Sequence, residues 1–150
     1  MKNFQNKLVD NSQKQPAASI PSVEEYMTKD LITFKADTDI NEVISSLLEN
    51  RISGAPVLDD NGKVVGLIDD KDCLKVLYGS LYNQMPSTSE TVSNYMSNVM
   101  KKINVNQSIL DVAMLFASTP YKRLLVMDDN DNLIGQVSRR DILRAIQELS

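Results

Sequence analysis

Residues 54–77 read GAPVLDDNGKVVGLIDDKDCLKVL, and residues 123–146 read RLLVMDDNDNLIGQVSRRDILRAI. In each stretch two short apolar runs flank a turn rich in Asp, Asn or Gly, and a helical pattern follows the second run. Apolar runs on either side of such a turn are typical of a β-hairpin. Each stretch therefore predicts a hairpin followed by a helix, and the chain contains this arrangement twice.

The two stretches belong to a longer internal repeat. A shift of 69 residues places 22–77 on 91–146 without a gap, with 12 identical residues in 56 aligned positions. A gapless match of this length indicates a duplicated structural unit. Around the first repeat, 22–77, we place a flexible N-terminal tail (1–21), a connector (78–90) and a second repeat (91–150).

The beginning of each repeat predicts a strand and an amphipathic helix. Asp39 with Glu42, and Ser108 with Asp111, have the spacing of helix caps. Apolar residues follow each cap at the spacing of one helix face. These residues are Ile40, Val43, Ile44, Leu47 and Leu48, and then Ile109, Val112, Ala113, Phe116 and Ala117. Each repeat therefore reads β-α-β-β-α, which makes the fold class α+β, and two such units can cover sheet faces that neither could bury alone.

The composition limits the chemistry that the chain can perform. It has 150 residues, a net charge of −4, one cysteine (Cys73) and no histidine. Histidine-dependent nucleophiles and the usual zinc ligand sets are therefore excluded, and Cys73 is expected to be a small core residue. No apolar stretch approaches the roughly 20 residues that span a bilayer. We expect a cytoplasmic protein without a membrane segment and without enzymatic activity.

The repeated sequence resembles the cystathionine-β-synthase (CBS) domain family over nearly all of 22–149. The resemblance is carried by EEYMT and SNYMS at the two openings, by RISGAPVLDDNGKVVGLIDDKD, and by YKRLLVMDDNDNLIGQVSRRD. It implies a pseudo-two-fold pair of CBS domains packed through their sheets, often called a Bateman module, which commonly dimerises. Family members typically bind adenine nucleotides or S-adenosylmethionine in clefts between the paired sheets and regulate an enzyme, channel or transporter. The resemblance therefore also implies a regulatory role.

The family's ligand motif is Gly, two apolar residues, Ser or Thr, two further residues and Asp. The second repeat contains it at 135–141, with Gln136 as the one departure. By resemblance, Asp141 would bind ribose hydroxyls and Ser138 a phosphate at the start of a helix. The implied site is completed by Arg139, Arg140, Lys102, Tyr121, Lys122 and Arg123. Because Ser138 and Asp141 also have the spacing of a capping box, spacing alone leaves open whether they bind a ligand or only cap the helix.

The first repeat departs from this motif, since Asp69 stands where Ser or Thr is expected. A carboxylate about 5 Å from a phosphate charge would be repelled by roughly 3 kcal/mol at an effective dielectric constant near 20. The formal charge is −6 over 22–77 and +2 over 91–146, which favours an anion site in the second repeat. By resemblance, a second, weaker cleft would be lined by Thr33, Gly54, Ala55, Pro56 and Asp72.

We therefore expect a non-catalytic regulatory module that binds AMP, ADP, ATP or S-adenosylmethionine in the inter-repeat cleft, mainly at the second repeat. It is expected to form a homodimer, to regulate an unidentified protein, and to use no catalytic cofactor and no metal. A turn at 128–132 imitates a calcium loop, but Leu133 stands where glycine is needed. The alternative is a ligand-free dimerisation module in which the motif is only a cap. Nucleic-acid binding is disfavoured by the sequence pI of about 4.8.

Overall fold

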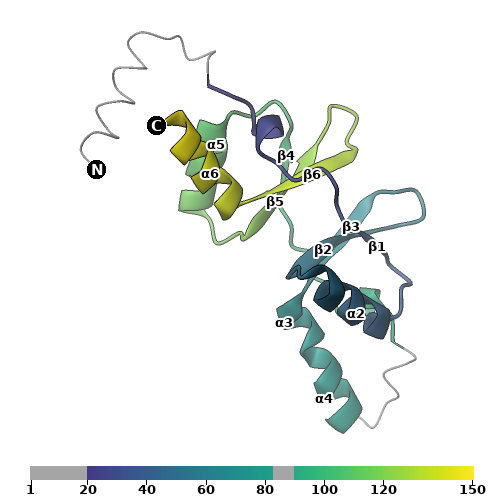
Figure 1. Ribbon diagram of the computed structural model, residues 1–150. Coiled ribbons are helices and arrows are strands. Elements are labelled where there is room, and N and C mark those ends of the chain that lie inside the picture. The colour runs from purple at the N-terminus through teal and green to yellow at the C-terminus, as the bar shows by residue number, and fades with distance from the viewer. Residues whose placement is uncertain (1–19, 83–89) are drawn as a thin grey trace. The chain divides into compact units, whose positions relative to one another are not determined.

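The computed structural model describes residues 20–82 and 90–150, with side chains described up to Tyr78 in the first range (Figure 1). Most of the predicted tail and of the connector lie outside the described residues. The chain divides into two compact units. Among the described residues, the N-terminal unit lies within Asp30–Met100, and the C-terminal unit consists of Lys101–Ser150 together with residues 20–29.

The C-terminal unit contains a three-stranded mixed sheet and two helices. Along the chain these are β4 (Lys102–Asn104), α5 (Ile109–Ser118), β5 (Arg123–Met127), β6 (Leu133–Ser138) and α6 (Arg139–Leu149). The central strand β5 runs parallel to β4 and antiparallel to β6. The order β-α-β-β-α and the α+β class agree with the prediction.

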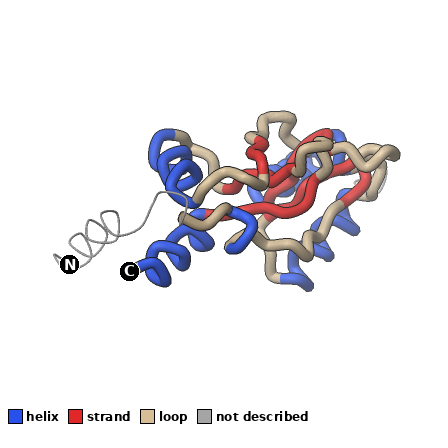
Figure 2. The backbone as a smooth tube through the Cα atoms, turned by 90° about the horizontal axis from the view of Figure 1, so that it is seen from above, coloured by secondary structure: helices blue, strands red, loops and turns tan. Residues whose placement is uncertain are grey.

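The N-terminal unit repeats this arrangement, and Figure 2 shows the strands and helices of the chain in red and blue. Its elements are β1 (Phe34–Lys35), α2 (Ile40–Asn50), β2 (Gly54–Leu58), β3 (Val64–Asp69), α3 (Asp70–Cys73) and α4 (Lys75–Tyr82). Again the central strand, β2, is parallel to the first and antiparallel to the third. The helix predicted after the hairpin is divided into α3 and α4 at Leu74.

Local sequence explains where the first helix of each unit begins. The Asp39 side chain accepts a hydrogen bond from the backbone N–H of Asn41 at 2.7 Å, and Ser108 accepts one from that of Asp111 at 3.2 Å. These bonds satisfy donors that the first turn of a helix leaves free. At the end of α2, Arg51 has a φ of 53°, a left-handed conformation that usually belongs to glycine.

One apolar face of each helix is buried against its sheet. In α2 the buried residues are Ile40, Val43 and Leu47, and in α5 they are Ile109, Val112 and Phe116. They share hydrophobic clusters with central strand residues, Val57 in β2 and Val126 in β5. The predicted apolar faces also included Leu48 of α2 and Ala117 of α5. Both residues are exposed because they lie at the margin of the apolar face of the helix rather than at its centre.

The openings of the two sequence repeats are exchanged between the units. The short 3₁₀ helix η2 (Val23–Glu25) and the residues after it join the C-terminal unit, where Thr28 exchanges backbone hydrogen bonds of 2.8 and 3.0 Å with Gln136. Likewise η4 (Val92–Asn94) joins the N-terminal unit, and Ser97 exchanges bonds of 2.8 and 2.9 Å with Leu67. Figure 1 shows the purple N-terminal segment beside β6. Each unit is therefore built from both repeats.

This exchange explains the glycine that both repeats carry in the third strand. A Cβ atom added to Gly135 would lie 2.7 Å from the Met27 Sδ and 2.9 Å from the carbonyl oxygen of Thr28. At Gly66 the same atom would lie 2.7 Å from the Met96 Sδ and 2.9 Å from the carbonyl oxygen of Ser97. The first residue of the ligand motif is thus required by the close approach of the exchanged segment.

Candidate functional site

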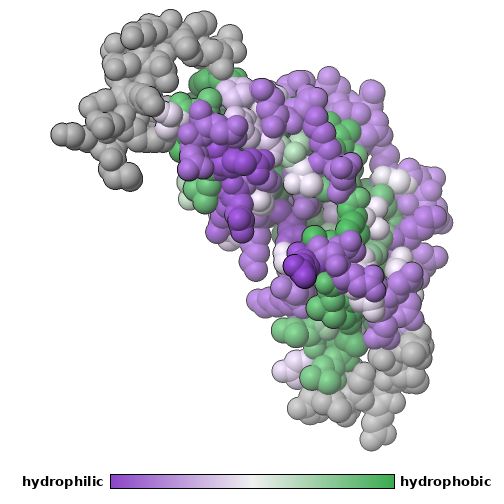
Figure 3. Space-filling model, in the orientation of Figure 1, coloured by the Kyte–Doolittle hydropathy of each residue, from purple (hydrophilic) through white to green (hydrophobic). Residues whose placement is uncertain are grey.

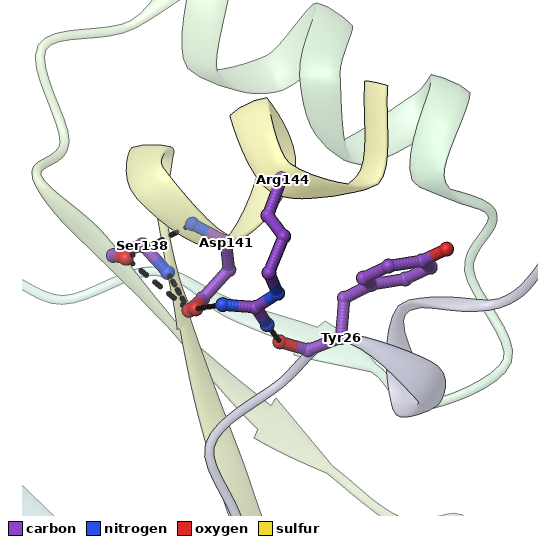
Figure 4. Close-up of polar contacts among 4 residues, drawn as sticks. All are labelled: Tyr26, Ser138, Asp141 and Arg144. Atoms are coloured by element: carbon purple, nitrogen blue, oxygen red, sulfur yellow. Dashed lines mark hydrogen bonds and ion pairs between the residues drawn. The ribbon is translucent and has the colours of Figure 1, made fainter. Parts of the chain in front are cut away.

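The candidate site lies at the junction of β6 and α6, where Ser138 is the helix N-cap (Figure 4). The Ser138 Oγ accepts the backbone N–H of Asp141 at 3.4 Å, and the Ser138 backbone N–H donates to the Asp141 Oδ2 at 2.9 Å. The Ser138 hydroxyl also donates to the same carboxylate oxygen at 3.2 Å. The two motif residues therefore form a complete capping box, which holds the carboxylate in one position at the start of the helix.

Asp141 is the buried charged residue of the described part of the chain, with 9% of its surface exposed. Its second oxygen, Oδ1, receives a long hydrogen bond of 3.4 Å from the Arg144 Nη1. A carboxylate offers about four acceptor positions, and two hydrogen bonds from Ser138 occupy Oδ2. Oδ1 therefore retains the capacity to accept a hydrogen bond from a further donor, such as a hydroxyl group.

Arg144 connects this carboxylate to the exchanged N-terminal segment. Its Nη2 donates to the carbonyl oxygen of Tyr26 at 3.0 Å, and its guanidinium carbon lies 6.0 Å from the centre of the Tyr26 ring. In Figure 4 the guanidinium group stands between the Asp141 carboxylate and the Tyr26 backbone. Arg144 lies outside the family's ligand motif and was not predicted as a site residue. The i,i+3 spacing of Asp141 and Arg144 is a signal for the ion pair, but no local pattern shows the contact with Tyr26.

The strand register separates the two faces of the sheet in the C-terminal unit. Leu124, Val126 and Val137 are buried in one cluster with residues of α5 and α6. Residues directly paired across strands point to the same side, and successive residues point to opposite sides. The pairs Lys102–Leu125, Leu125–Gln136 and Arg123–Ser138 therefore lie on the other face. This places three of the predicted residues, Lys102, Arg123 and Ser138, on one side of the sheet.

The other predicted residues of this site are distributed around it. Arg139 and Arg140 are exposed and form the first two positions of α6. Lys122 is exposed just before β5, and Lys102 is exposed at the start of β4. Tyr121 is half-buried and packs against the hydrophobic cluster behind the sheet. The geometry therefore brings Arg139 and Arg140 to the capping box, while Tyr121 contributes to the core.

The corresponding junction of the N-terminal unit, between β3 and α3, has two carboxylates. The Asp69 Oδ1 accepts the backbone N–H of Asp72 at 2.8 Å, and the Asp69 backbone N–H donates to the Asp72 Oδ2 at 3.2 Å. Burial raises the pKa of Asp72, and the charge of Asp69 acts in the same direction. Binding of an anionic ligand at this junction is therefore unfavourable.

The predicted residues of the weaker cleft occupy two faces of the N-terminal sheet. Gly54 and Pro56 are buried in β2 and pair with Asp69 and Leu67 of β3. Ala55 points the other way, into the hydrophobic cluster beneath α2. Thr33 is exposed just before β1. Only some of these residues thus share a face with the Asp69–Asp72 capping box.

Nearby, Cys73 packs against the N-terminal cluster, as expected for a small core residue. Burial raises the pKa of its thiol to about 11, with the charges of Asp72, Asp69 and Asp70 adding to the effect. The thiol is therefore protonated at neutral pH and a weak nucleophile.

Two further properties concern only residues 20–82 and 90–150. Within these ranges no three or more His, Cys, Asp or Glu side chains are grouped so that they could hold a metal ion. Nor is any helix there both long enough and apolar enough to cross a membrane.

Comparison with known proteins places both halves of the sequence in one family. The family model described as CBS domain matches residues 23–79 and 92–148. The CBS domain-containing protein CBSX1, chloroplastic, from Arabidopsis thaliana is 29% identical over 95% of this chain and 70% of its own length.

Solved structures give the same result. The crystal structure of CBSX2 in complex with AMP has a TM-score of 0.73 and 28% identity, covering 85% of this chain and 97% of that one. The CBS domain pair of MJ0100, in complex with 5′-methylthioadenosine and S-adenosyl-L-methionine, has a TM-score of 0.71 and covers 87% of this chain and 99% of that one. At 24% identity, the second likeness concerns the fold alone.

Proposed function

Because the chain belongs to the CBS domain family, we propose that it is a non-catalytic regulatory module that binds an adenine nucleotide or a related adenosyl ligand at the N-terminus of α6. The observation that carries the proposal is the Ser138–Asp141 capping box, with its fixed and buried carboxylate. The AMP complex of CBSX2, which has 28% sequence identity and the same fold, supports the ligand class.

The chemistry of the junction suits a nucleoside phosphate. The free N–H groups and the positive end of the α6 dipole favour an anion at its N-terminus. Arg139 and Arg140, both exposed at this end, supply charge and forked donors for phosphate oxygens. The Asp141 Oδ1 then accepts from a ribose hydroxyl, while Ser138 and Arg144 keep the carboxylate in place.

The same ligand is not expected at the junction of β3 and α3. There Asp69 replaces Ser138 and Asp70 replaces Arg139, while Asp72 corresponds to Asp141. A phosphate would face the carboxylates of Asp69 and Asp70 in place of a hydroxyl and an arginine. One nucleotide per chain is therefore the expected stoichiometry.

Exposed apolar side chains on the helices support a homodimer as part of the proposal. In the C-terminal unit they are Leu110 and Met114 of α5 and Leu143 of α6, with 53%, 62% and 65% of their surfaces exposed. In the N-terminal unit they are Leu48, Leu74, Leu77 and Tyr78. Figure 3 shows hydrophobic residues gathered on the surface over α4. Grouped exposed apolar residues mark interaction sites, and a second copy would cover them.

These faces also support the second candidate function, a module that assembles without a ligand. Light scattering of the purified protein tests the assembly: a dimer is expected, and a monomer would remove this part of the proposal. A matched variant, Met114→Lys, places a charge on the exposed face of α5 and is expected to weaken the dimer without unfolding the chain.

Calorimetric titration of the full chain with AMP, ADP, ATP and S-adenosylmethionine tests the ligand. Asp141→Asn keeps an acceptor for the Ser138 N–H but removes the charge, so we expect affinity to fall by about tenfold or more, the effect of losing a hydrogen bond to a charged group. The equivalent change in the other repeat, Asp72→Asn, is the control and should leave the affinity unchanged. Absence of binding by the unmodified chain would leave only the assembly function.

A further inference from the structure

One polar atom near the site has no explanation in the fold. The Gln136 Oε1 is buried and has no hydrogen-bond partner among the residues that the structure describes. Gln136 lies in β6, two residues before Ser138, and its backbone is fully used by the paired bonds to Thr28. A buried acceptor without a donor costs free energy and is rare in native proteins.

The position of Gln136 relates this atom to the candidate site. Side chains two residues apart on a strand point to the same side, so Gln136 shares its face with Ser138. Their Cα atoms are separated by about 7 Å, two residue steps along a strand. A nucleoside monophosphate is longer than this distance. If the phosphate and ribose of such a ligand bind at Ser138 and Asp141, its base therefore extends far enough to contact Gln136.

The other repeat shows that the amide is not needed for folding. The position aligned with Gln136 in the first repeat is Leu67, which makes the equivalent pair of backbone bonds with Ser97. Leucine therefore satisfies the backbone requirements of this position. The glutamine occurs in the repeat whose capping box carries Ser138, and the sheet by itself does not require it.

We propose that Gln136 is a specificity-determining residue that accepts a hydrogen bond from the 6-amino group of adenine. The inference rests on the proposed function, because it assumes a nucleotide at the start of α6. Glutamine matches adenine well: its oxygen can accept from the amino group while its nitrogen donates to N7. Hypoxanthine and guanine present a carbonyl oxygen at the 6-position, which would face the Gln136 oxygen and be rejected.

The test compares two ligands on two proteins. AMP and purine riboside 5′-monophosphate, which differs from AMP only by lacking the 6-amino group, are titrated into the unmodified chain and into Gln136→Leu. The unmodified chain is expected to bind AMP roughly tenfold more tightly than the analogue, the value of one satisfied buried hydrogen bond. Gln136→Leu is expected to bind the two with equal affinity.

The variant has its own folding control. Since Gln136→Leu removes a buried acceptor without a partner, its thermal midpoint in the absence of ligand should equal or exceed that of the unmodified chain. The comparison of the two ligands on the unmodified chain does not depend on the variant, and equal affinities there would overturn the role of Gln136 even if the variant fails to fold.

The outcomes separate the inference from the function on which it rests. Equal binding of AMP and the analogue by the unmodified chain would overturn the role of Gln136 while the nucleotide site stands. Discrimination that persists in Gln136→Leu would do the same, as would tighter binding of inosine 5′-monophosphate than of AMP. Absence of binding by any of these nucleotides would overturn both.

Discussion

Substitution of Gly135 by alanine should detach the exchanged N-terminal segment from β6. The new Cβ would lie 2.7 Å from the Met27 Sδ and 2.9 Å from the carbonyl oxygen of Thr28. The methionine side chain can move, but Thr28 is held by two backbone hydrogen bonds to Gln136, so the segment has to shift as a whole. Overpacking of this kind costs about 1–3 kcal/mol, and each weakened backbone bond adds about 1 kcal/mol.

We therefore expect Gly135→Ala to lower the free energy of unfolding by about 3 kcal/mol. For a chain of this size that corresponds to a fall of roughly 6–12 °C in the thermal midpoint. Urea unfolding followed by circular dichroism measures it. Gly62→Ala is the matched control: its Cβ would meet nothing within 4 Å, and its φ of +81° makes a smaller cost of about 1 kcal/mol the expectation. If Gly135→Ala were as stable as the unmodified chain, the packing explanation of the motif glycine would be wrong.

Three further predictions concern stability. Arg51→Gly should raise the free energy of unfolding by about 1 kcal/mol in urea, because Arg51 ends α2 with a φ of 53° that glycine adopts without strain; a loss of stability would show that its side chain matters more. Arg144→Ala should cost about 1 kcal/mol in the same assay, since a half-exposed ion pair and one bond to the Tyr26 carbonyl are lost, and no change would show that the contact is dispensable. The pKa of Asp72 is above its ordinary value of 3.8, so the folded state binds this proton more tightly than the unfolded state. The protonated carboxyl therefore contributes to stability below pH 3.8, and this contribution is lost as the pH rises through the raised pKa. Asp72→Asn should flatten this decline in urea midpoints measured upward from about pH 3.5, and parallel curves for the two proteins would contradict the assignment.

Sequence patterns predicted much of each unit because they act locally. The hairpins follow from short apolar runs around turns, and the helix starts follow from caps at Asp39 and Ser108. The capping box at Ser138 and Asp141 has the predicted spacing, and the structure contains it. Its role as a ligand site is a proposal that the spacing could suggest only together with the family resemblance.

The features that were missed depend on partners distant in sequence. Both repeats open with a Tyr–Met pair, Tyr26–Met27 and Tyr95–Met96, so nothing in either opening tells which sheet it will join. The bond between Arg144 and Tyr26 spans 118 residues and exists only because of that exchange. The Gln136 Oε1 lacks a hydrogen-bond partner because it is buried in the folded unit. In the sequence, Gln136 is only a polar residue at an apolar position of the motif.

The proposed function requires that an adenosyl ligand binds where β6 meets α6. An NMR titration of the isotopically labelled full chain with AMP, following the backbone amides, tests where binding occurs. The largest shifts are expected at Ser138, Arg139, Arg140 and Asp141, with small ones at the equivalent positions 69–72. Shifts confined to 69–72, or a spectrum unchanged by AMP and S-adenosylmethionine, would contradict it.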